Sequence, residues 1–270
     1  MPLKKIFYLI LASLFFLGCP AKHQKEENAF TYLGKPIDPS AIDALYNAES
    51  KFLDLRSFKS VIPFEERKDH PTRIDFPKDA NTGRTPFFDY GCVANVQDRF
   101  LLLIQYNGGG TGYFDNILVI KKTGTQLFLL KTLGEGDRCN GGISGEGMDG
   151  NDFHYSRNLT PIDIIRLATE VKIDVTAYED LEASAISCFG LAHYKYNFVD
   201  DKIELMSVSL AEEKEDEKEW TDRYQAQSCF NKIYNSYVKA KKTELNLKDL
   251  NEFAKKFRDE CLKKTSSVLR

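Results

Sequence analysis

The pattern of apolar and polar positions predicts a largely antiparallel β region in the middle of the chain. Residues 100–106 form a continuous apolar run, which is typical of a central strand. Residues 114–121 and 126–133 follow it across turns rich in Gly and Thr, as in an antiparallel meander. Residues 186–199 and 202–210 indicate a further hairpin. Because strands do not alternate with long helices, a doubly wound sheet is excluded.

Helical periodicity marks the two ends of this β region. Residues 41–50 follow a turn that opens a short helix, and residues 212–242 carry large apolar side chains three or four positions apart. Asn246 is a suitable N-cap for a second C-terminal helix over residues 247–264. Since the connection is short, we expect these two helices to run antiparallel. The predicted fold class is therefore α+β: an antiparallel β-sheet body with a short N-terminal helix and a C-terminal antiparallel helical hairpin packed on it.

The first residues have the composition of an export signal. Lys4 and Lys5 precede an uncharged run over residues 6–18. This run is shorter than the roughly 20 apolar residues that a membrane-spanning helix needs. It matches instead the apolar region of a secretory signal peptide.

The end of this run resembles the lipobox of bacterial lipoproteins. Leu17-Gly18-Cys19 matches its last three positions, whereas Phe16 stands where Leu is usual. The resemblance implies that the Cys19 thiol receives diacylglycerol, that the chain is cleaved before Cys19, and that the new amine is acylated. Pro20, in place of Asp, favours the periplasmic face of the outer membrane over the inner membrane. The alternatives are a plain secretory peptide and an uncleaved membrane anchor.

These assignments divide the 270-residue chain into four parts. We expect a signal peptide at 1–18, a lipidated cysteine with a flexible tether at 19–30, the β domain at 31–211 and the helical hairpin at 212–264. A hydrophobic content of 42% is that of a folded protein rather than a disordered one. The net charge of −3 becomes −5 without Lys4 and Lys5, so a nucleic-acid partner is not expected.

Export to an oxidising compartment makes disulfide bonds expected among the other five cysteines. In an antiparallel helical hairpin, the numbers of two residues that face each other add up to a nearly constant sum. Cys229 and Cys261 fit this sum, so we expect a disulfide between them. The alternative is that both are buried free thiols. Cys139 with Cys188 is the favoured second pair, with Cys92 as a buried thiol, although the sequence leaves open which of these three is unpaired. No Cys-x-x-Cys pair exists and no His has ligand spacing to a Cys, so we expect neither a metal site nor a cofactor.

The Gly-rich segment 134–154 is the candidate functional site. So many glycines predict an exposed, irregular loop, where binding residues concentrate. The spacing of its acidic residues does not fit the calcium-binding loop of an EF-hand. Residues 142–146 are similar to the Gly-x-Ser-x-Gly motif of a nucleophile elbow, but Glu146 stands where the motif has its last Gly. The candidate binding residues are Asp137, Arg138, Glu146, Asp149, Asp152 and His154.

The expected function is that of a lipid-anchored, non-enzymatic cell-envelope protein that binds another macromolecule. Its partners would be the lipid bilayer, through acylated Cys19, and a protein in the envelope. In anchor, size and acidity the chain resembles periplasmic inhibitor lipoproteins, including immunity proteins against bacterial toxins. One alternative is an envelope hydrolase in which Asp137, Glu146, His154 and His193 converge. Another is a structural or assembly lipoprotein that docks through the helical hairpin.

Overall fold

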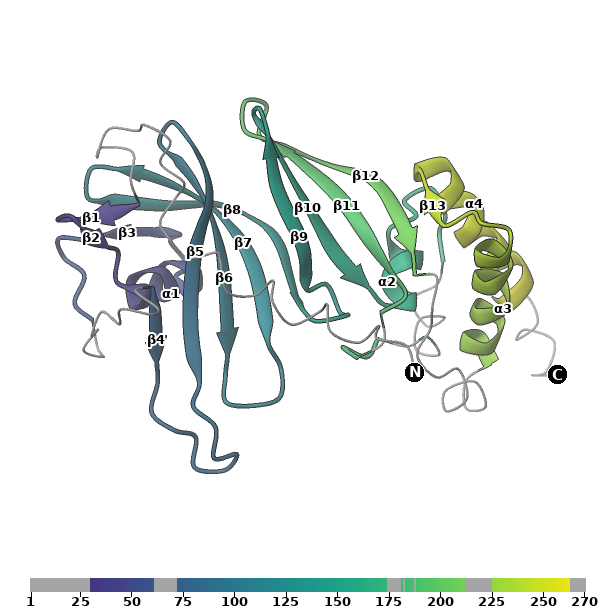
Figure 1. Cartoon of the computed structure of the whole chain (residues 1–270), viewed down its shortest axis with the longest axis horizontal. Coiled ribbons are helices and arrows are strands. Elements are labelled where there is room, and N and C mark those ends of the chain that lie inside the picture. The colour runs from purple at the N-terminus through teal and green to yellow at the C-terminus, as the bar shows by residue number, and fades with distance from the viewer. Residues whose placement is uncertain are drawn as a thin grey trace, which may run out of the picture. The chain divides into compact units, whose positions relative to one another are not determined.

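The computed structural model describes residues 30–60, 72–173, 181, 183–186, 188–211 and 225–262 (Figure 1). The signal segment and the tether before Phe30 lie outside these residues. The structure is mostly antiparallel β-sheet, with 43% strand and 23% helix. The predicted α+β class is therefore wrong, because the helices are few and short. None of the described helices is both long and apolar enough to cross a membrane.

The chain divides into two compact units. Unit 1 comprises Met1–Ile104, Gly108–Gly110 and Leu118–Lys131, and unit 2 comprises Gln105–Asn107, Thr111–Ile117 and Thr132–Arg270. A six-stranded sheet of order β3-β8-β7-β6-β5-β4 makes up most of unit 1 and is curled like half of a barrel (Figure 1). Its strands are β3 (Phe52–Asp54), β4 (Arg73–Asp75), β5 (Phe87–Val96), β6 (Arg99–Asn107), β7 (Phe114–Thr123) and β8 (Gln126–Asp137).

The predicted central strand is the centre of the unit 1 core. In β6, Phe100, Leu101, Leu102 and Ile104 are all buried, as the continuous apolar run indicated. The short helix α1 (Pro39–Asn47) is capped by Asp38, whose carboxylate accepts a hydrogen bond from the backbone N–H of Ser40. A small hairpin of β1 (Thr31–Tyr32) and β2 (Lys35–Pro36) precedes α1.

Unit 2 contains a five-stranded sheet of order β13-β12-β11-β10-β9. Its helices share one apolar core with this sheet, in which Ala192, Val208 and Leu210 lie among Phe230, Phe253 and Phe257. The elements are β9 (Ile143–Asp149), β10 (Asp152–Leu159), α2 (Pro161–Arg166), β11 (Gly190–Asn197), β12 (Lys202–Leu210), α3 (Gln225–Lys239), β13 (Glu244–Leu245), α4 (Leu247–Phe257) and a π-helical turn at Arg258–Leu262.

The structure shows no clear helical hairpin at the C-terminal end. The segment between α3 and α4 is not a simple connection, because β13 extends the sheet by pairing with Val208 and Ser209 of β12. Leu245 is buried in the core while Glu244 is exposed. This strand of two residues thus shows the alternation of buried and exposed side chains that is typical of a strand. The first part of the predicted helix, residues 212–224, lies outside the described residues. The second helix ends as an α-helix at Phe257 rather than at residue 264.

Candidate binding site

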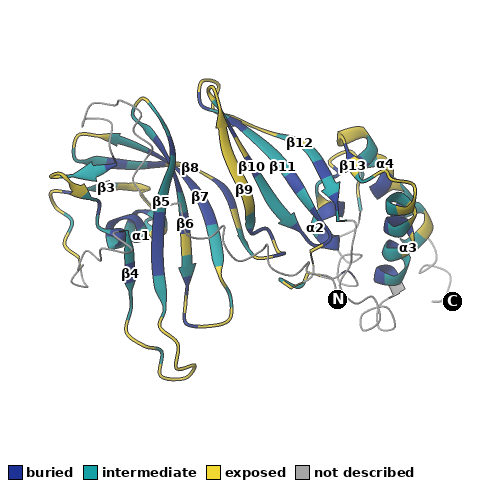
Figure 2. Cartoon of the chain, in the orientation of Figure 1, coloured by how far each residue is buried: buried dark blue, intermediate teal, exposed yellow. Residues whose placement is uncertain are grey.

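Most of the segment expected to be an irregular loop is regular β structure. Within 134–154, β8 continues to Asp137, and β9 and β10 form a hairpin closed by Gly150 and Asn151. The φ angle of Gly150 is +60°, which a two-residue hairpin turn with Gly in its first position requires. The prediction of exposure holds best for β9, whose residues from Ser144 onward are all exposed (Figure 2).

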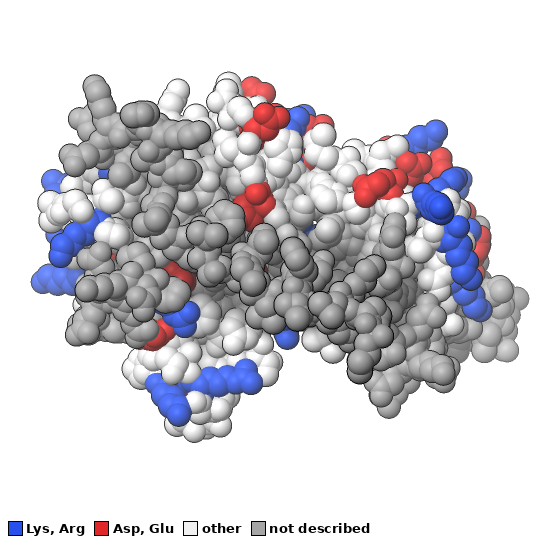
Figure 3. All heavy atoms as spheres, in the orientation of Figure 1, with Lys and Arg blue, Asp and Glu red and all other residues white. Residues whose placement is uncertain are grey.

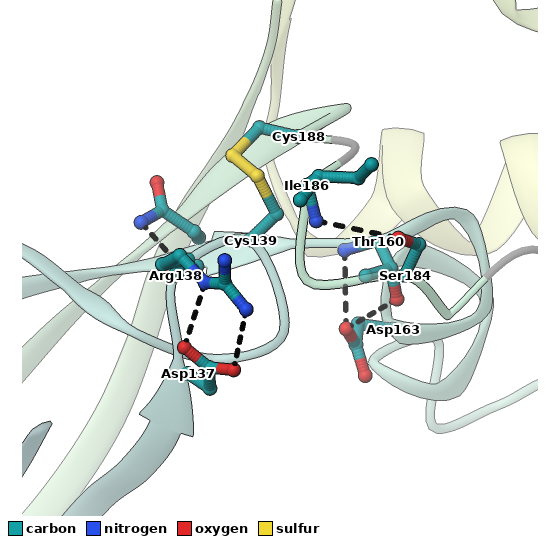
Figure 4. The surroundings of a disulfide bond; sticks show 9 residues. Asp137, Arg138, Cys139, Thr160, Asp163, Ser184, Ile186 and Cys188 are labelled. Atoms are coloured by element: carbon teal, nitrogen blue, oxygen red, sulfur yellow. Dashed lines mark hydrogen bonds and ion pairs between the residues drawn. A yellow bond between two sulfur atoms is a disulfide. The ribbon is translucent and has the colours of Figure 1, made fainter. Parts of the chain in front are cut away.

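The short loop between β8 and β9 is fixed by a disulfide bond. Cys139 is bonded to Cys188, with their Cα atoms 4.6 Å apart (Figure 4). The backbone N–H of Cys139 also donates to the carbonyl of Ala185 at 3.1 Å. The other predicted pair is bonded as well, with 5.6 Å between the Cα atoms of Cys229 and Cys261. Both bonds indicate an extracytoplasmic location, since cytosolic disulfides are rare.

Cys92 is not the buried free thiol that the sequence led us to expect. It too is disulfide-bonded. Its partner lies outside the described residues.

Asp137 and Arg138 form an ion pair within the loop. The guanidinium donates to both carboxylate oxygens, at 2.9 and 3.0 Å (Figure 4). The carboxylate also accepts from the backbone N–H of Tyr113 at 3.1 Å. The bonds from Arg138 are the main reason that the pKa of Asp137 is below its usual value. The loop is thus held by both a covalent bond and a charged pair.

Arg157 of β10 joins this loop to the end of β8. Its guanidinium donates to the carbonyl oxygens of Glu135 at 3.0 Å and Gly141 at 3.3 Å. The backbones are so close here that a Cβ on Gly136 would lie 2.1 Å from the carbonyl carbon of Gly141. The glycines of the loop therefore allow close packing rather than mobility. Sequence reasoning missed Arg157 because an Arg inside a strand pattern carries no signal of its own.

An acidic group lies beside the loop within unit 2. Asp115, at the start of β7, accepts hydrogen bonds from Gln105 at 2.8 Å and from the backbone N–H of Ile143. Burial raises the pKa of Asp115, and repulsion from Asp137 raises it further. The side chain of Glu146 is exposed but partly desolvated, and this desolvation together with the charge of Asp115 raises its pKa. Sequence reasoning also missed Asp115, which lies some 30 residues away from Glu146 along the chain.

The predicted loop residues do not converge on one site. Glu146 is paired with Tyr155 across the β9–β10 ladder, while His154 is the next residue along β10. Successive side chains of a strand project to opposite faces, so Glu146 and His154 lie on different faces of the sheet. Asp152 accepts from Asn197 at 2.5 Å and lies 4.0 Å from the Lys195 ammonium. Asp149 is exposed beside the turn.

The side chains proposed for the hydrolase alternative are likewise separated by the alternation of faces along the strands. His193 is paired with Ser156, two residues from His154, so both histidines lie on the face opposite Glu146. Its Nδ1 atom is 2.9 Å from Ser156 Oγ and its Nε2 atom is 2.6 Å from Ser209 Oγ. These contacts link β10, β11 and β12 next to the register shift at His193. The four proposed catalytic residues therefore do not form one cluster.

The described residues contain no group of His, Cys, Asp or Glu arranged to hold a metal ion. Charged side chains of both signs are spread over the molecular surface, with a row of basic ones along the helices α3 and α4 (Figure 3). Comparisons with known proteins found no matching family model, no matching curated protein and no matching solved structure.

Proposed function

We propose that this protein is a lipid-anchored component of the bacterial cell envelope that binds a partner protein through the loop 138–142 and the strand β9. The observation that carries the proposal is the combination of rigidity and exposure in this segment. The loop is fixed by the Cys139–Cys188 bond and by Arg157, yet β9 beside it is exposed. A rigid exposed surface loses little conformational entropy when it binds, which favours recognition.

The charge of this surface defines the kind of partner. The carboxylate of Asp115 repels those of Asp137 and Glu146, and of these three Asp137 alone forms a described ion pair with an arginine. A basic surface would relieve this repulsion, and opposite charges speed association and exclude wrong partners. In this mode the protein works by covering the partner's basic surface, as an inhibitor or immunity lipoprotein would.

The anchor is proposed on the lipobox resemblance. Two or more acyl chains at one site hold a protein firmly on a bilayer, because each buried CH₂ contributes about 0.8 kcal/mol. The sulfur of Cys19 that carries the diacylglyceryl group would be a thioether sulfur, and such a sulfur cannot also form a disulfide. Lipidation at Cys19 and a bond from Cys19 to Cys92 therefore exclude one another, which makes the anchor directly testable.

The anchor is tested on the full chain produced in a bacterial host with an alkyne analogue of palmitate. We expect label on the wild type and none on Cys19→Ala. The intact mass of the membrane-bound protein should equal that of a chain starting at residue 19 plus diacylglyceryl and one amide-linked acyl group. An unlabelled wild type, or a mature chain whose Cys19 is disulfide-bonded to Cys92, contradicts the anchor.

The binding role is tested by photo-crosslinking in the same cells. A benzoylphenylalanine at position 144 should give a discrete protein adduct, because Ser144 is exposed on β9. The same residue at position 49, on an exposed part of unit 1, serves as the control. We expect Glu146→Lys to abolish the adduct from position 144. Absence of any adduct specific to position 144 refutes the binding role.

A further inference from the structure

Among the described residues, no strand pairs with the outer edge of β9. In the described part of unit 2, β9 is the last strand of its sheet, and it pairs on one side with β10. A sheet edge presents backbone N–H and C=O groups that another extended chain can pair with. Natural proteins protect such edges with charged side chains, Lys above all, and with Pro, β-bulges or very short strands. The seven residues Ile-Ser-Gly-Glu-Gly-Met-Asp of β9 include two carboxylates, and the ladder with β10 has one register shift, but the strand contains neither Lys nor Pro.

The register shows which backbone groups are available. Asp149 and Asp152 flank the two-residue turn and therefore form a hydrogen-bonded pair. Hydrogen-bonded and non-hydrogen-bonded pairs alternate along an antiparallel ladder, so Gly147 with His154 is the next bonded pair. The N–H and C=O groups of Glu146 and Met148 consequently point outward from the sheet.

The described residues leave both faces of β9 open from Ser144 onward. A Cβ atom added to Gly145 or Gly147 would meet no atom within 4 Å. On the opposite face, the side chain of Met148 is 40% exposed and that of Glu146 is also exposed. An incoming strand would therefore meet a flat glycine surface on one side and two side chains, one acidic and one apolar, on the other.

The charge of Glu146 determines which kind of extended segment fits this edge. None of the described cations forms an ion pair with it, and the charged group that shifts its pKa is the repulsive carboxylate of Asp115. Opposite charges facing each other across a strand pair are stabilising, whereas like charges are destabilising. A basic residue on the incoming strand would face Glu146, and an apolar residue two positions before it would face Met148.

A second copy of this chain is a poorer occupant. Depending on the register, antiparallel self-pairing through the outward groups of β9 places Glu146 opposite Ser144, Glu146, Met148 or Gly150 of the second copy. None of these residues supplies the missing cation, and pairing with a second Glu146 adds repulsion.

We propose that the free edge of β9 binds an extended segment of a partner protein by strand addition, with an apolar residue facing Met148 and a Lys or Arg facing Glu146. The inference rests on the proposed function, because it names the mode of recognition at the same site. Main-chain hydrogen bonds provide affinity in such complexes, and alternate side chains provide specificity.

The test uses the full-length protein and a fluorescein-labelled peptide, Ser-Thr-Thr-Val-Thr-Lys-Thr-Thr-Ser, followed by fluorescence anisotropy. We expect saturable binding that falls at least tenfold in Met148→Pro relative to Met148→Ala. Both variants lose the side chain, but only proline removes the outward N–H, and no bond to β10 is lost. Glu146→Lys should weaken binding of this peptide at least fivefold and strengthen binding of the peptide with Glu in place of Lys.

Three outcomes overturn the inference. The first is no saturable binding at peptide concentrations up to about 1 mM, where even a weak complex is populated. The second is equal binding by Met148→Pro and Met148→Ala. The third is a dimer, seen by sedimentation, that Met148→Pro abolishes, since the edge would then hold a second copy. If crosslinking from position 144 succeeds while these peptides fail, the binding function stands and strand addition is wrong.

Discussion

The guanidinium of Arg157 donates a hydrogen bond to the carbonyl oxygen of Glu135 at 3.0 Å, and thereby ties the middle of β10 to the end of β8. The same group reaches Gly141 in the loop at 3.3 Å and also hydrogen-bonds the hydroxyl of Tyr194. One side chain therefore holds three backbone segments around the candidate binding site. A hydrogen bond from a charged group contributes about 1.5 to 3 kcal/mol, which gives Arg157 a measurable share of the stability.

Replacing Arg157 with Ala should lower the free energy of unfolding by about 2 kcal/mol, because the carbonyls of Glu135 and Gly141 lose a charged donor. Arg157→Lys should recover less than half of this loss, since an ammonium cannot reproduce the geometry of the fork. Urea denaturation followed by circular dichroism measures both values. Arg138→Ala is the control and should change stability by less than about 1 kcal/mol, because its ion pair is solvent-exposed. Equal losses for Arg157→Ala and Arg138→Ala would contradict this role.

The glycines of the segment should divide into two classes when each is replaced with Ala. At Gly136 the new Cβ would lie 2.1 Å from a backbone carbon and 2.4 Å from the carbonyl oxygen of Asn140, so the loop must move. We expect Gly136→Ala to lower the free energy of unfolding by about 3 kcal/mol. Gly145→Ala has open space around it and should be tolerated within about 0.5 kcal/mol. Thermal unfolding of the two variants gives the comparison, and similar midpoints would refute it.

Strong local periodicity explains what the sequence analysis predicted correctly. The apolar run at residues 100–106 and the turns around it correspond to β6 to β8, because these signals come from neighbouring residues. Both disulfide pairs were found as well, one from the spacing of Cys229 and Cys261 around a short connection. The same connection misled the fold prediction, because two residues that pair with β12 look like part of a turn.

The candidate site was predicted less well than the fold. Glycine-rich strands such as β9 lack the branched and aromatic residues that mark a strand, so the segment resembled a loop. Its register depends on pairing with β10 and β11, which local sequence does not specify. Asp115 and Arg157 belong to the site through tertiary contacts, and no spacing within the chain indicates them. The convergence of Glu146 with His154 failed because strand geometry separates neighbouring side chains.

The two described disulfides should differ in whether they slow hydrogen exchange at residues 138–142. Loss of either bond, in Cys139→Ser with Cys188→Ser or in Cys229→Ser with Cys261→Ser, should lower the free energy of unfolding by about 4 kcal/mol on the loop-entropy model. Hydrogen–deuterium exchange separates their roles. We expect faster exchange at residues 138–142 in the first double variant and unchanged exchange there in the second. Loss of protection at this loop in both variants would show that the Cys139–Cys188 bond does not fix it specifically.

The charge of Glu146 should cost stability at neutral pH. Burial and the neighbouring Asp115 raise its pKa in the folded state, so between the unfolded and folded pKa values the folded chain binds more protons than the unfolded chain. Stability from this group therefore falls as the pH rises through that window. Glu146→Gln removes the charge and should raise the free energy of unfolding at pH 7 by a few tenths of a kcal/mol, the scale of exposed charge interactions.

The advantage of Glu146→Gln should disappear near pH 3, where the wild-type carboxyl is protonated in both states. Glu204→Gln is the matched control, because Glu204 lies 3.4 Å from the Lys195 ammonium and its loss removes an attraction. We expect that variant to be less stable than the wild type at pH 7, also by a few tenths of a kcal/mol. Urea titrations of the three proteins at pH 3, 5 and 7 measure these differences. A Glu146→Gln variant less stable than the wild type at pH 7 would mean that Glu146 already has a favourable partner.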